Sequence, residues 1–323
     1  MLMLTTTTKY LVARASFWDD MTVLQTNGLT KRYGSFVAVE ELNLSIGDGE
    51  IYGFLGPNGA GKSTTIDLLL GFSEPTEGTV ELFGRNPTAA PTAVRSQIGL
   101  LPEGATPYEN LTGRKHVEFA ADAKNVEVDA SALIDRVGLS QADADRPAGD
   151  YSKGMSQRLG LAMALVGDPD LLVLDEPSSG LDPTGMAELR ELIRAEADAG
   201  TAVLFSSHIL EEVEAVCDRV GILDDGRLVA QDTVDALRGS VTERNVVELS
   251  LGEPPTDFGL ESLAGVGRIE VDGRTVRVTC ETPTAKGRVI AHVHERAELL
   301  DVVTSGSSLE EVFAAYAGEE APA

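Results

Sequence analysis

Cysteine, long apolar runs and basic side chains are all scarce in this sequence of 323 residues. The two cysteines, Cys217 and Cys280, lie far apart and without the spacing of a metal site, so they indicate a reducing compartment and no disulfide framework. No apolar run approaches the roughly 18 residues that a membrane span needs. The longest run, 159–167, is bounded by Arg158 and Asp168. We therefore expect any contact with a membrane to be made through a partner.

Basic residues are outnumbered, since 26 lysines and arginines face 52 acidic side chains, which gives a formal net charge of -26. A surface this negative repels phosphate backbones, so we expect no nucleic-acid partner. Salt screens the repulsion between like charges on a folded surface. Such an acidic composition is typical of proteins from a halophilic cytosol. The alternative is an ordinary acidic protein.

Residues 1–21 lack the long apolar core and the cleavage site of a secretory signal. We predict a disordered tail here, followed by a better-patterned segment that opens at Met21. Translation from Met1 and translation from Met21 both fit this pattern.

Strand and helix patterns alternate over residues 22–238, which predicts an α/β fold with a mainly parallel sheet. Alternating apolar and polar residues over 23–46 predict a small antiparallel sheet at its start. The pattern turns helical between 110 and 150, so we expect a helical subdomain at about 103–160. Further strands are expected at 51–55, 79–83, 98–101, 171–174, 202–205, 220–223 and 227–230, and further helices at 62–70, 156–166, 188–199 and 210–217.

The last part of the chain, residues 239–323, has a different pattern, which predicts a small α+β domain. The turn Asp272-Gly273 is expected to join two of its strands in a hairpin. Its strands are expected at 246–251, 267–273, 275–280 and 299–303, with a helix at 284–297 and a closing helix at 308–317.

Residues 56–63, GPNGAGKS, fit the phosphate-binding loop of P-loop NTPases, between an expected strand and an expected helix. The glycines let backbone N–H groups turn toward phosphate oxygens, and the helix adds the positive end of its dipole. Lys62 would contact the β- and γ-phosphates, and the hydroxyl of Ser63 would ligand Mg²⁺. Alone, the loop does not distinguish kinases, GTPases and transport ATPases. The residues expected to contact the nucleotide here are Gly56, Pro57, Asn58, Gly59, Ala60, Gly61, Lys62, Ser63 and Thr64.

Two acidic residues follow the apolar run 171–174, which predicts a buried strand. That strand would deliver Asp175 to its end, where the carboxylate can hold Mg²⁺ through water. Glu176 would lie one residue beyond and orient the attacking water as general base.

Residues 151–158, YSKGMSQR, resemble the signature sequence of ABC ATPases. The phosphate loop, the acidic pair, SSGLD ending at Asp182 and Ser207-His208 stand in the order of that family, and the resemblance covers about residues 22–235. It implies a P-loop core that binds ATP and Mg²⁺ and works as a homodimer, or as a heterodimer with a second ATPase. Each nucleotide would lie between the phosphate loop of one subunit and the signature of the other.

The resemblance also implies roles for single residues. Ser152 and the N–H group of Gly154 would face the γ-phosphate across the interface, at a helix N-terminus that favours anions. Tyr33 matches the aromatic residue that stacks on adenine. His208 matches a catalytic histidine that touches the γ-phosphate, and Asp182 belongs to a loop that couples the two sites.

Two departures from the family pattern concern Glu103 and the signature. Glu103 occupies a lid position where glutamine is usual, and an ionised carboxylate can ligand Mg²⁺ but cannot donate a hydrogen bond. The signature reads Ser-Lys-Gly-Met where Ser-Gly-Gly-Gln is commoner. Both changes, and the C-terminal extension, are similar to exporter ATPases of the ABC-2 type. We therefore expect a cytoplasmic protein that binds separate transmembrane permease subunits at the inner face of the cell membrane.

A narrower resemblance links the segments 101–120 and 151–169 to the ATPase of the copper-maturation transporter for nitrous oxide reductase. His292 and His294 add no copper site, because positions two apart on a helix point to nearly opposite sides. An ABC importer ATPase is the main alternative. A non-transport ABC ATPase is disfavoured by the acidity and by the lack of a coiled coil or a second ATPase unit.

Overall fold

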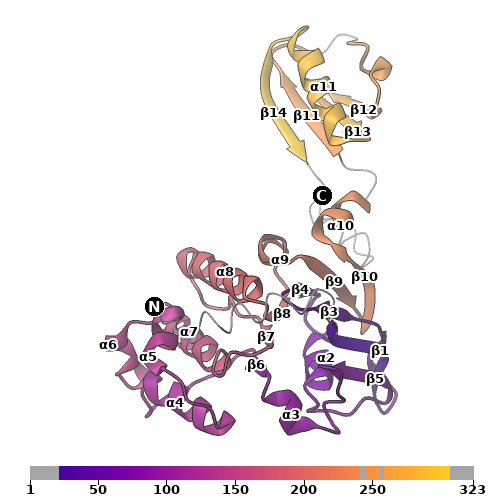
Figure 1. Ribbon diagram of the computed structural model, residues 1–323. Helices are drawn as coiled ribbons and strands as arrows, with labels where there is room; N and C mark the ends of the chain where they lie inside the picture. The colour runs from indigo at the N-terminus through magenta and orange to yellow at the C-terminus, as the bar shows by residue number, and fades with distance from the viewer. Residues whose placement is uncertain (1–21, 241–244, 255–257, 306–323) are drawn as a thin grey trace, which may run out of the picture. The chain divides into compact units, whose positions relative to one another are not determined.

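The computed structural model describes residues 22–240, 245–254 and 258–305 and divides into two compact units (Figure 1). The first unit ends at Asp232 and the second begins at Thr233, slightly before the predicted boundary at 238/239. The predicted tail 1–21 and the predicted closing helix 308–317 lie outside the described residues.

The first unit opens with an antiparallel sheet, as predicted from the alternation over 23–46. Apolar side chains of the first strand, such as Leu24 and Leu29, are fully buried in the core. The expected strand at 79–83 joins this sheet by pairing with β1. The strands are β1 (Thr22–Tyr33), β2 (Phe36–Leu42), β3 (Ser45–Gly47) and β5 (Glu77–Leu82), in the order β2-β1-β3 with β5 also on β1.

A six-stranded sheet forms the centre of this unit, in the order β10-β9-β4-β8-β7-β6. Its inner pairs are parallel, and every residue of β4 and β7 is buried, which explains their continuous apolar sequences. The carboxyl ends of these parallel strands share one edge of the sheet, where ligands of open α/β sheets bind. The strands are β4 (Ile51–Leu55), β6 (Ile98–Leu101), β7 (Leu171–Asp175), β8 (Ala202–Ser207), β9 (Arg219–Asp224) and β10 (Arg227–Thr233).

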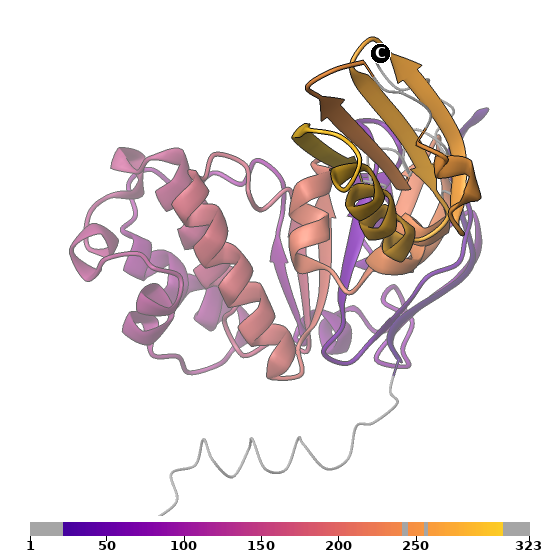
Figure 2. The same cartoon turned by 90° about the horizontal axis from the view of Figure 1, so that it is seen from above.

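The helices α4, α5 and α6 gather at one end of this unit, and the antiparallel strands lie at the other end, with the six-stranded sheet between them (Figures 1 and 2). Two helices begin earlier than predicted, because Ser152 caps α7 and Asp182 caps α8. Across the described part of the chain, no helix has the length and apolarity needed to span a membrane. The helices are α2 (Lys62–Leu69), α3 (Pro91–Arg95), α4 (Gly113–Lys124), α5 (Ala130–Arg136), α6 (Gln141–Ala144), α7 (Lys153–Ala164), α8 (Pro183–Asp198) and α9 (Leu210–Val216).

The second unit contains an antiparallel sheet in the order β12-β13-β11-β14, with α11 packed on it. Alternate side chains of the central strands, among them Val247 and Val278, form its core with Val289 of the helix. The predicted strands are thereby confirmed, and the helix predicted at 284–297 is present but ends three residues earlier, at His294. The elements are α10 (Val234–Ser240), β11 (Asn245–Leu251), β12 (Val266–Asp272), β13 (Thr275–Cys280), α11 (Pro283–His294) and β14 (Leu299–Ser305).

Candidate nucleotide site

The loop between β4 and α2 turns through a space that admits glycine alone at two positions. A Cβ atom on Gly56 would lie 2.4 Å from the carbonyl oxygen of Leu223, and one on Gly61 would lie 2.5 Å from that of Ala38. Gly61 also has a φ of 103°, a left-handed conformation that other residues rarely adopt. The sequence can therefore make this tight turn into the helix only with glycine at both positions.

Lys62, the first residue of α2, is buried with 7% of its surface exposed. Its ammonium group donates hydrogen bonds to the carbonyl oxygens of Gly56 and Pro57. Its Nζ atom also lies 3.8 Å from Oε1 of Glu176. Burial lowers the pKa of Lys62, against the opposing influence of nearby carboxylates, of which Glu176 is the strongest. The ammonium group is thus a concentrated positive charge held against the loop, suited to phosphate oxygens.

Asp175 ends β7 and is buried, and the hydroxyl of Ser206 on the neighbouring strand β8 donates a 2.7 Å hydrogen bond to Oδ1. Burial raises the pKa of Asp175, whereas the Ser206 hydrogen bond lowers it. The charge of Glu103 raises that pKa, whereas a hydrogen bond from the Glu103 backbone lowers it, and both residues line the same pocket. A positively charged ligand beside Asp175 would offset both the cost of burying its charge and the repulsion from Glu103.

Glu176 follows directly and has a positive φ of 50°, which is uncommon for a residue with a side chain. Its backbone N–H donates a 3.0 Å hydrogen bond to the carbonyl oxygen of Ser206. Its Oε2 atom lies 2.8 Å from Nδ1 of His208, just beyond β8. The parallel register of β7 and β8 therefore brings together two residues that are 32 positions apart in the sequence.

The phosphate loop and the acidic strand end line a single pocket of about 270 Å³. The residues that line the pocket include most of those predicted to contact the nucleotide, Glu103 among them. They also include both residues of the predicted acidic pair, Asp175 and Glu176. Gly56 and Ala60 are buried and are absent from the lining. The lining residues are Phe36, Ala38, Pro57, Asn58, Gly59, Gly61, Lys62, Ser63, Thr64, Glu103, Asp175 and Glu176.

The sequence motifs did not predict three residues of the site, Phe36, Ala38 and Ser206. Phe36 pairs with Tyr33 across the two-residue turn between β1 and β2, and both aromatic side chains are exposed, at 61% and 52%. Tyr33 does not line the pocket, and its ring lies 5.1 Å from the ammonium nitrogen of Lys31. The sequence Tyr-Gly-Ser-Phe at 33–36 could have indicated a two-residue hairpin turn, which places Phe36 opposite Tyr33.

Neither the signature residues nor Asp182 lines this pocket. The hydroxyl oxygen of Ser152 accepts a 3.2 Å hydrogen bond from the backbone of Met155, and Asp182 caps α8 in the same manner. The two loops lie side by side, because a Cβ atom on Gly154 would be 3.5 Å from the carbonyl oxygen of Gly180. The N-terminus of α7 and the loop before α8 are therefore close together, and neither lines the pocket at the phosphate loop.

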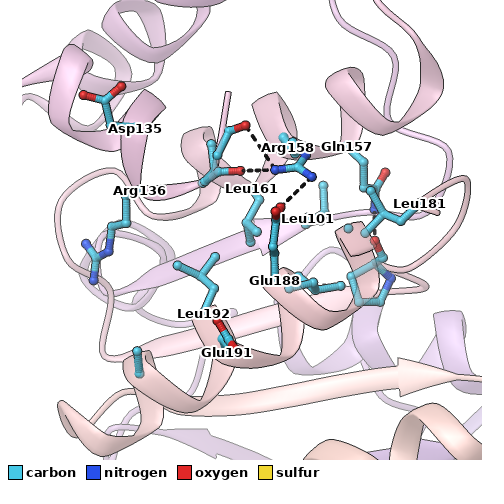
Figure 3. Close-up of a pocket in the computed structure, with 16 residues that line it drawn as sticks. Leu101, Asp135, Arg136, Gln157, Arg158, Leu161, Leu181, Glu188, Glu191 and Leu192 are labelled. Atoms are coloured by element: carbon cyan, nitrogen blue, oxygen red, sulfur yellow. Dashed lines mark hydrogen bonds and ion pairs between the residues drawn. The ribbon is translucent and has the colours of Figure 1, made fainter. Parts of the chain in front are cut away.

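A second pocket, of about 360 Å³, lies between α5, α7 and α8 (Figure 3). Arg158 of the signature helix points across it and donates to the carbonyl oxygens of Val137 and Gly138, at 3.2 and 3.1 Å. Its other terminal nitrogen lies 2.7 Å from Oε2 of Glu188 on α8. Arg158 thus ties the helical part of the unit to both the signature helix and the helix that follows Asp182.

The two histidines of α11 have different surroundings. His292 is half-buried, and its Nε2 atom donates a 2.8 Å hydrogen bond to the carbonyl oxygen of Phe258, whereas His294 is exposed. Among the described residues, no group of three or more histidine, cysteine, aspartate or glutamate side chains could hold a metal ion. The contact to Phe258 gives His292 a packing role in the second unit.

The chain is similar in sequence to ATP-binding proteins of transporters. It matches the family model described as "ABC transporter" over residues 39–179. The daunorubicin/doxorubicin resistance ATP-binding protein DrrA of Streptomyces peucetius is 36% identical over 309 residues, 92% of this chain and 93% of that protein. The bacitracin transport ATP-binding protein BcrA of Bacillus licheniformis is 43% identical over 222 residues, 67% of this chain and 72% of that protein.

One further relative and one solved structure also indicate similarity to transporter ATP-binding proteins. The Nod factor export ATP-binding protein I of Sinorhizobium fredii is 36% identical over 265 residues, 80% of this chain and 76% of that protein. A solved structure, an ATP-binding subunit of an ABC transporter, superposes with a TM-score of 0.63 at 32% sequence identity. The match covers 68% of this chain and 93% of that structure.

Proposed function

The chain belongs to the family of ABC transporter ATP-binding subunits, and from that premise we propose that it couples closure of an ATP-bound dimer to movement of separate membrane subunits. Membership makes the chain an ATP-binding and ATP-hydrolysing subunit. Relatives named for antibiotic resistance, bacitracin transport and Nod factor export favour the exporter branch. The observation that supports hydrolysis best is the cluster of Lys62, Asp175, Glu176 and His208 at one edge of the central sheet.

Hydrolysis requires a base beside the γ-phosphate and a positive charge to hold that phosphate. Glu176 fits the base, because one carboxylate oxygen faces the ammonium group of Lys62 and the other faces His208. Glu176 would accept a proton from the attacking water. Lys62 would exchange its hydrogen bonds to the loop carbonyls for bonds to phosphate oxygens. His208 would orient Glu176 through the 2.8 Å contact and meet the γ-phosphate.

The donor set of the pocket also fits Mg²⁺, a hard cation that prefers oxygen ligands. Asp175 is a buried carboxylate whose pKa is raised, so a cation beside it would relieve an unfavourable charge. Ser63, Asp175 and Glu103 would hold the ion together with phosphate oxygens. When bound, Mg²⁺ neutralises charge on the β- and γ-phosphates.

The proposed active unit is a dimer with composite sites. Ser152 and Gly154 would face the nucleotide of the partner subunit, and Asp182 would lie at the same interface. This is supported by the absence of these residues from the pocket of their own chain and by their exposed helix N-termini. ATP-binding cassettes with this fold include dimeric structures, one of them with ADP and phosphate. Two copies of this chain, or this chain and a second ATPase, would meet this requirement.

We place this dimer at the inner face of the cell membrane, in the cytoplasm, on a transmembrane permease. The narrower resemblance to the copper-maturation system remains a prediction. Identification of the genes beside this one tests the assembly, since an exporter subunit should co-purify with a neighbouring membrane protein when the two are co-expressed. Co-transcription with an extracellular solute-binding protein would instead favour an importer.

Phosphate release from ATP and Mg²⁺ by the purified chain tests the proposed hydrolysis. Lys62→Ala sets the baseline, because it removes the buried charge at the loop. Activity clearly above that baseline is expected. A wild-type rate equal to that of Lys62→Ala would contradict the proposal.

A further inference from the structure

Glu212, on the first turn of α9, is a buried carboxylate outside the nucleotide pocket, with 4% of its surface exposed. Two serine hydroxyls donate to its Oε2 atom, Ser178 at 2.6 Å and Ser207 at 3.0 Å. Ser207 in turn accepts a 3.0 Å hydrogen bond from the backbone N–H of Ile209. A buried carboxylate is costly unless its oxygens are satisfied, so this arrangement fixes both serines tightly.

The two serines belong to the two segments that carry the catalytic pair. Ser178 lies two residues after Glu176, and Ser207 directly precedes His208. Glu212 is therefore a bridge between the loop after β7 and the end of β8, and it does not line the pocket.

Glu176 needs such support because its φ of 50° is unfavourable for a residue with a side chain. Residues in such conformations persist only where their surroundings over-determine them. On one side of Glu176, Asp175 is held by Ser206 of β8. On the other side, Ser178 is held by Glu212.

We propose that Glu212 is a positioning residue of the hydrolysis site, which holds Ser178 and Ser207 so that Glu176 and His208 keep their mutual distance. This inference rests on the proposed function. Without the bridge, the loop after β7 keeps the hydrogen bond from Gln157 of α7 to the carbonyl oxygen of Pro177 but loses its tie to Ser207 and α9, and Glu176 can relax from its strained conformation. The attacking water would then be poorly oriented, while the phosphate loop, which binds the nucleotide, is unaffected.

The test compares Glu212→Ala with Glu212→Gln and with the matched control Glu211→Ala, which removes an exposed carboxylate from the same turn. Glu212→Ala should lower kcat by about 10- to 100-fold, the range expected when a catalytic group is misplaced by around 1 Å. Its KM for ATP should change by less than about threefold, because ground-state binding is not altered. Glu212→Gln should recover most of kcat, since its amide oxygen can accept both serine hydroxyls. Glu211→Ala should match the wild type.

If Glu212→Ala fails to fold, the single variants Ser178→Ala and Ser207→Ala each remove one hydrogen bond and leave Glu212 paired with the other serine hydroxyl. Each should lower kcat without raising KM. Wild-type kcat in these variants, with only a lower melting temperature, would overturn the inference and leave Glu212 a structural residue.

A second comparison separates the two proposals. In the Glu176→Gln background, Glu212→Ala should cause little further loss in single-turnover rate, because both act through the same carboxylate. A full additional loss would show that Glu212 does not act through Glu176 and would overturn the inference. A wild type without hydrolysis above Lys62→Ala would instead refute the proposed function.

Discussion

The carboxylate of Glu176 lies between two different partners, with Oε2 2.8 Å from Nδ1 of His208 and Oε1 3.8 Å from Nζ of Lys62. Each oxygen thus faces a group that stabilises its charge, so the carboxylate is held from two sides. Preorganisation of this kind lowers the reorganisation needed when the reaction begins.

Glu176→Gln is expected to separate binding from hydrolysis. The amide keeps the size of the side chain but cannot accept a proton, so turnover should fall on the order of 10²-fold or more. ATP binding should persist, because Lys62 and the loop remain, and an ATP-bound dimer should accumulate. Steady-state phosphate release, equilibrium ATP binding and gel filtration with ATP measure these effects. Turnover near that of the wild type would remove Glu176 from the mechanism.

Asp175→Asn is expected to stabilise the nucleotide-free protein while it abolishes efficient hydrolysis. Burial raises the pKa of Asp175 above its unfolded value, so the ionised carboxylate opposes folding above that folded pKa. Asparagine carries no charge and can still accept the hydrogen bond from Ser206. At neutral pH and with a chelator present, its melting temperature should exceed that of the wild type by about a few degrees.

The pH dependence of this difference provides the control. The penalty in the wild type fades as the pH falls through the folded pKa of Asp175, so the two melting temperatures should converge in acid. Asp122→Asn, a change at an exposed position of α4, should show no comparable gain at neutral pH. A neutral-pH melting temperature of Asp175→Asn below the wild type would contradict the argument.

Much of the fold follows from local patterns in the sequence. The strands at 51–55, 220–223 and 227–230 lie where they were predicted, because burial and apolar patterning are local properties. The starts of α7 and α8 were predicted several residues late. Their first turns contain Gly154 and Gly185, poor helix formers, so the caps at Ser152 and Asp182 decide where the helices begin.

The site was predicted less completely than the fold, because several of its contacts join residues distant in the sequence. Ser206 and Glu212 are unremarkable in the sequence, and they acquire partners 31 and 34 positions away only when β7 and β8 pair. Phe36 enters the pocket lining through the register of a hairpin. The motifs identified most of the residues at the phosphate loop but not those that support them.

Salt is expected to stabilise this protein, because its net charge of -26 crowds like charges on the folded surface. The Debye length falls from about 10 Å at 0.1 M to about 3 Å at 1 M, so that repulsion is progressively screened. The melting temperature and the ATPase rate should both rise with KCl toward the molar range. Sucrose at equal osmolality is the control, since it strengthens burial without screening charge. Full stability at roughly 50 mM salt would count against a halophilic origin.

Catalysis is expected to belong to the dimer, which mixing of two inactive variants tests. Lys62→Ala removes the charge at the phosphate loop, and Ser152→Arg blocks the helix N-terminus proposed to face the partner's phosphate. Each homodimer has two damaged sites. In the heterodimer both lesions fall on one composite site and the other site is intact, so hydrolysis should return in proportion to the heterodimer formed.

The matched control for this experiment mixes Lys62→Ala with Glu176→Gln. Both residues line one pocket and are therefore proposed to serve the nucleotide of their own chain. Each site of that heterodimer therefore carries one lesion, and no hydrolysis should return. A single intact site that cannot act alone would mask complementation, so a cross-link between Ser152→Cys of one chain and Gly59→Cys of another measures the contact directly. The cross-link should form between chains and depend on ATP. Without recovery and without this cross-link, the composite-site proposal would fail, and the phosphate contacts would have to come from within one chain.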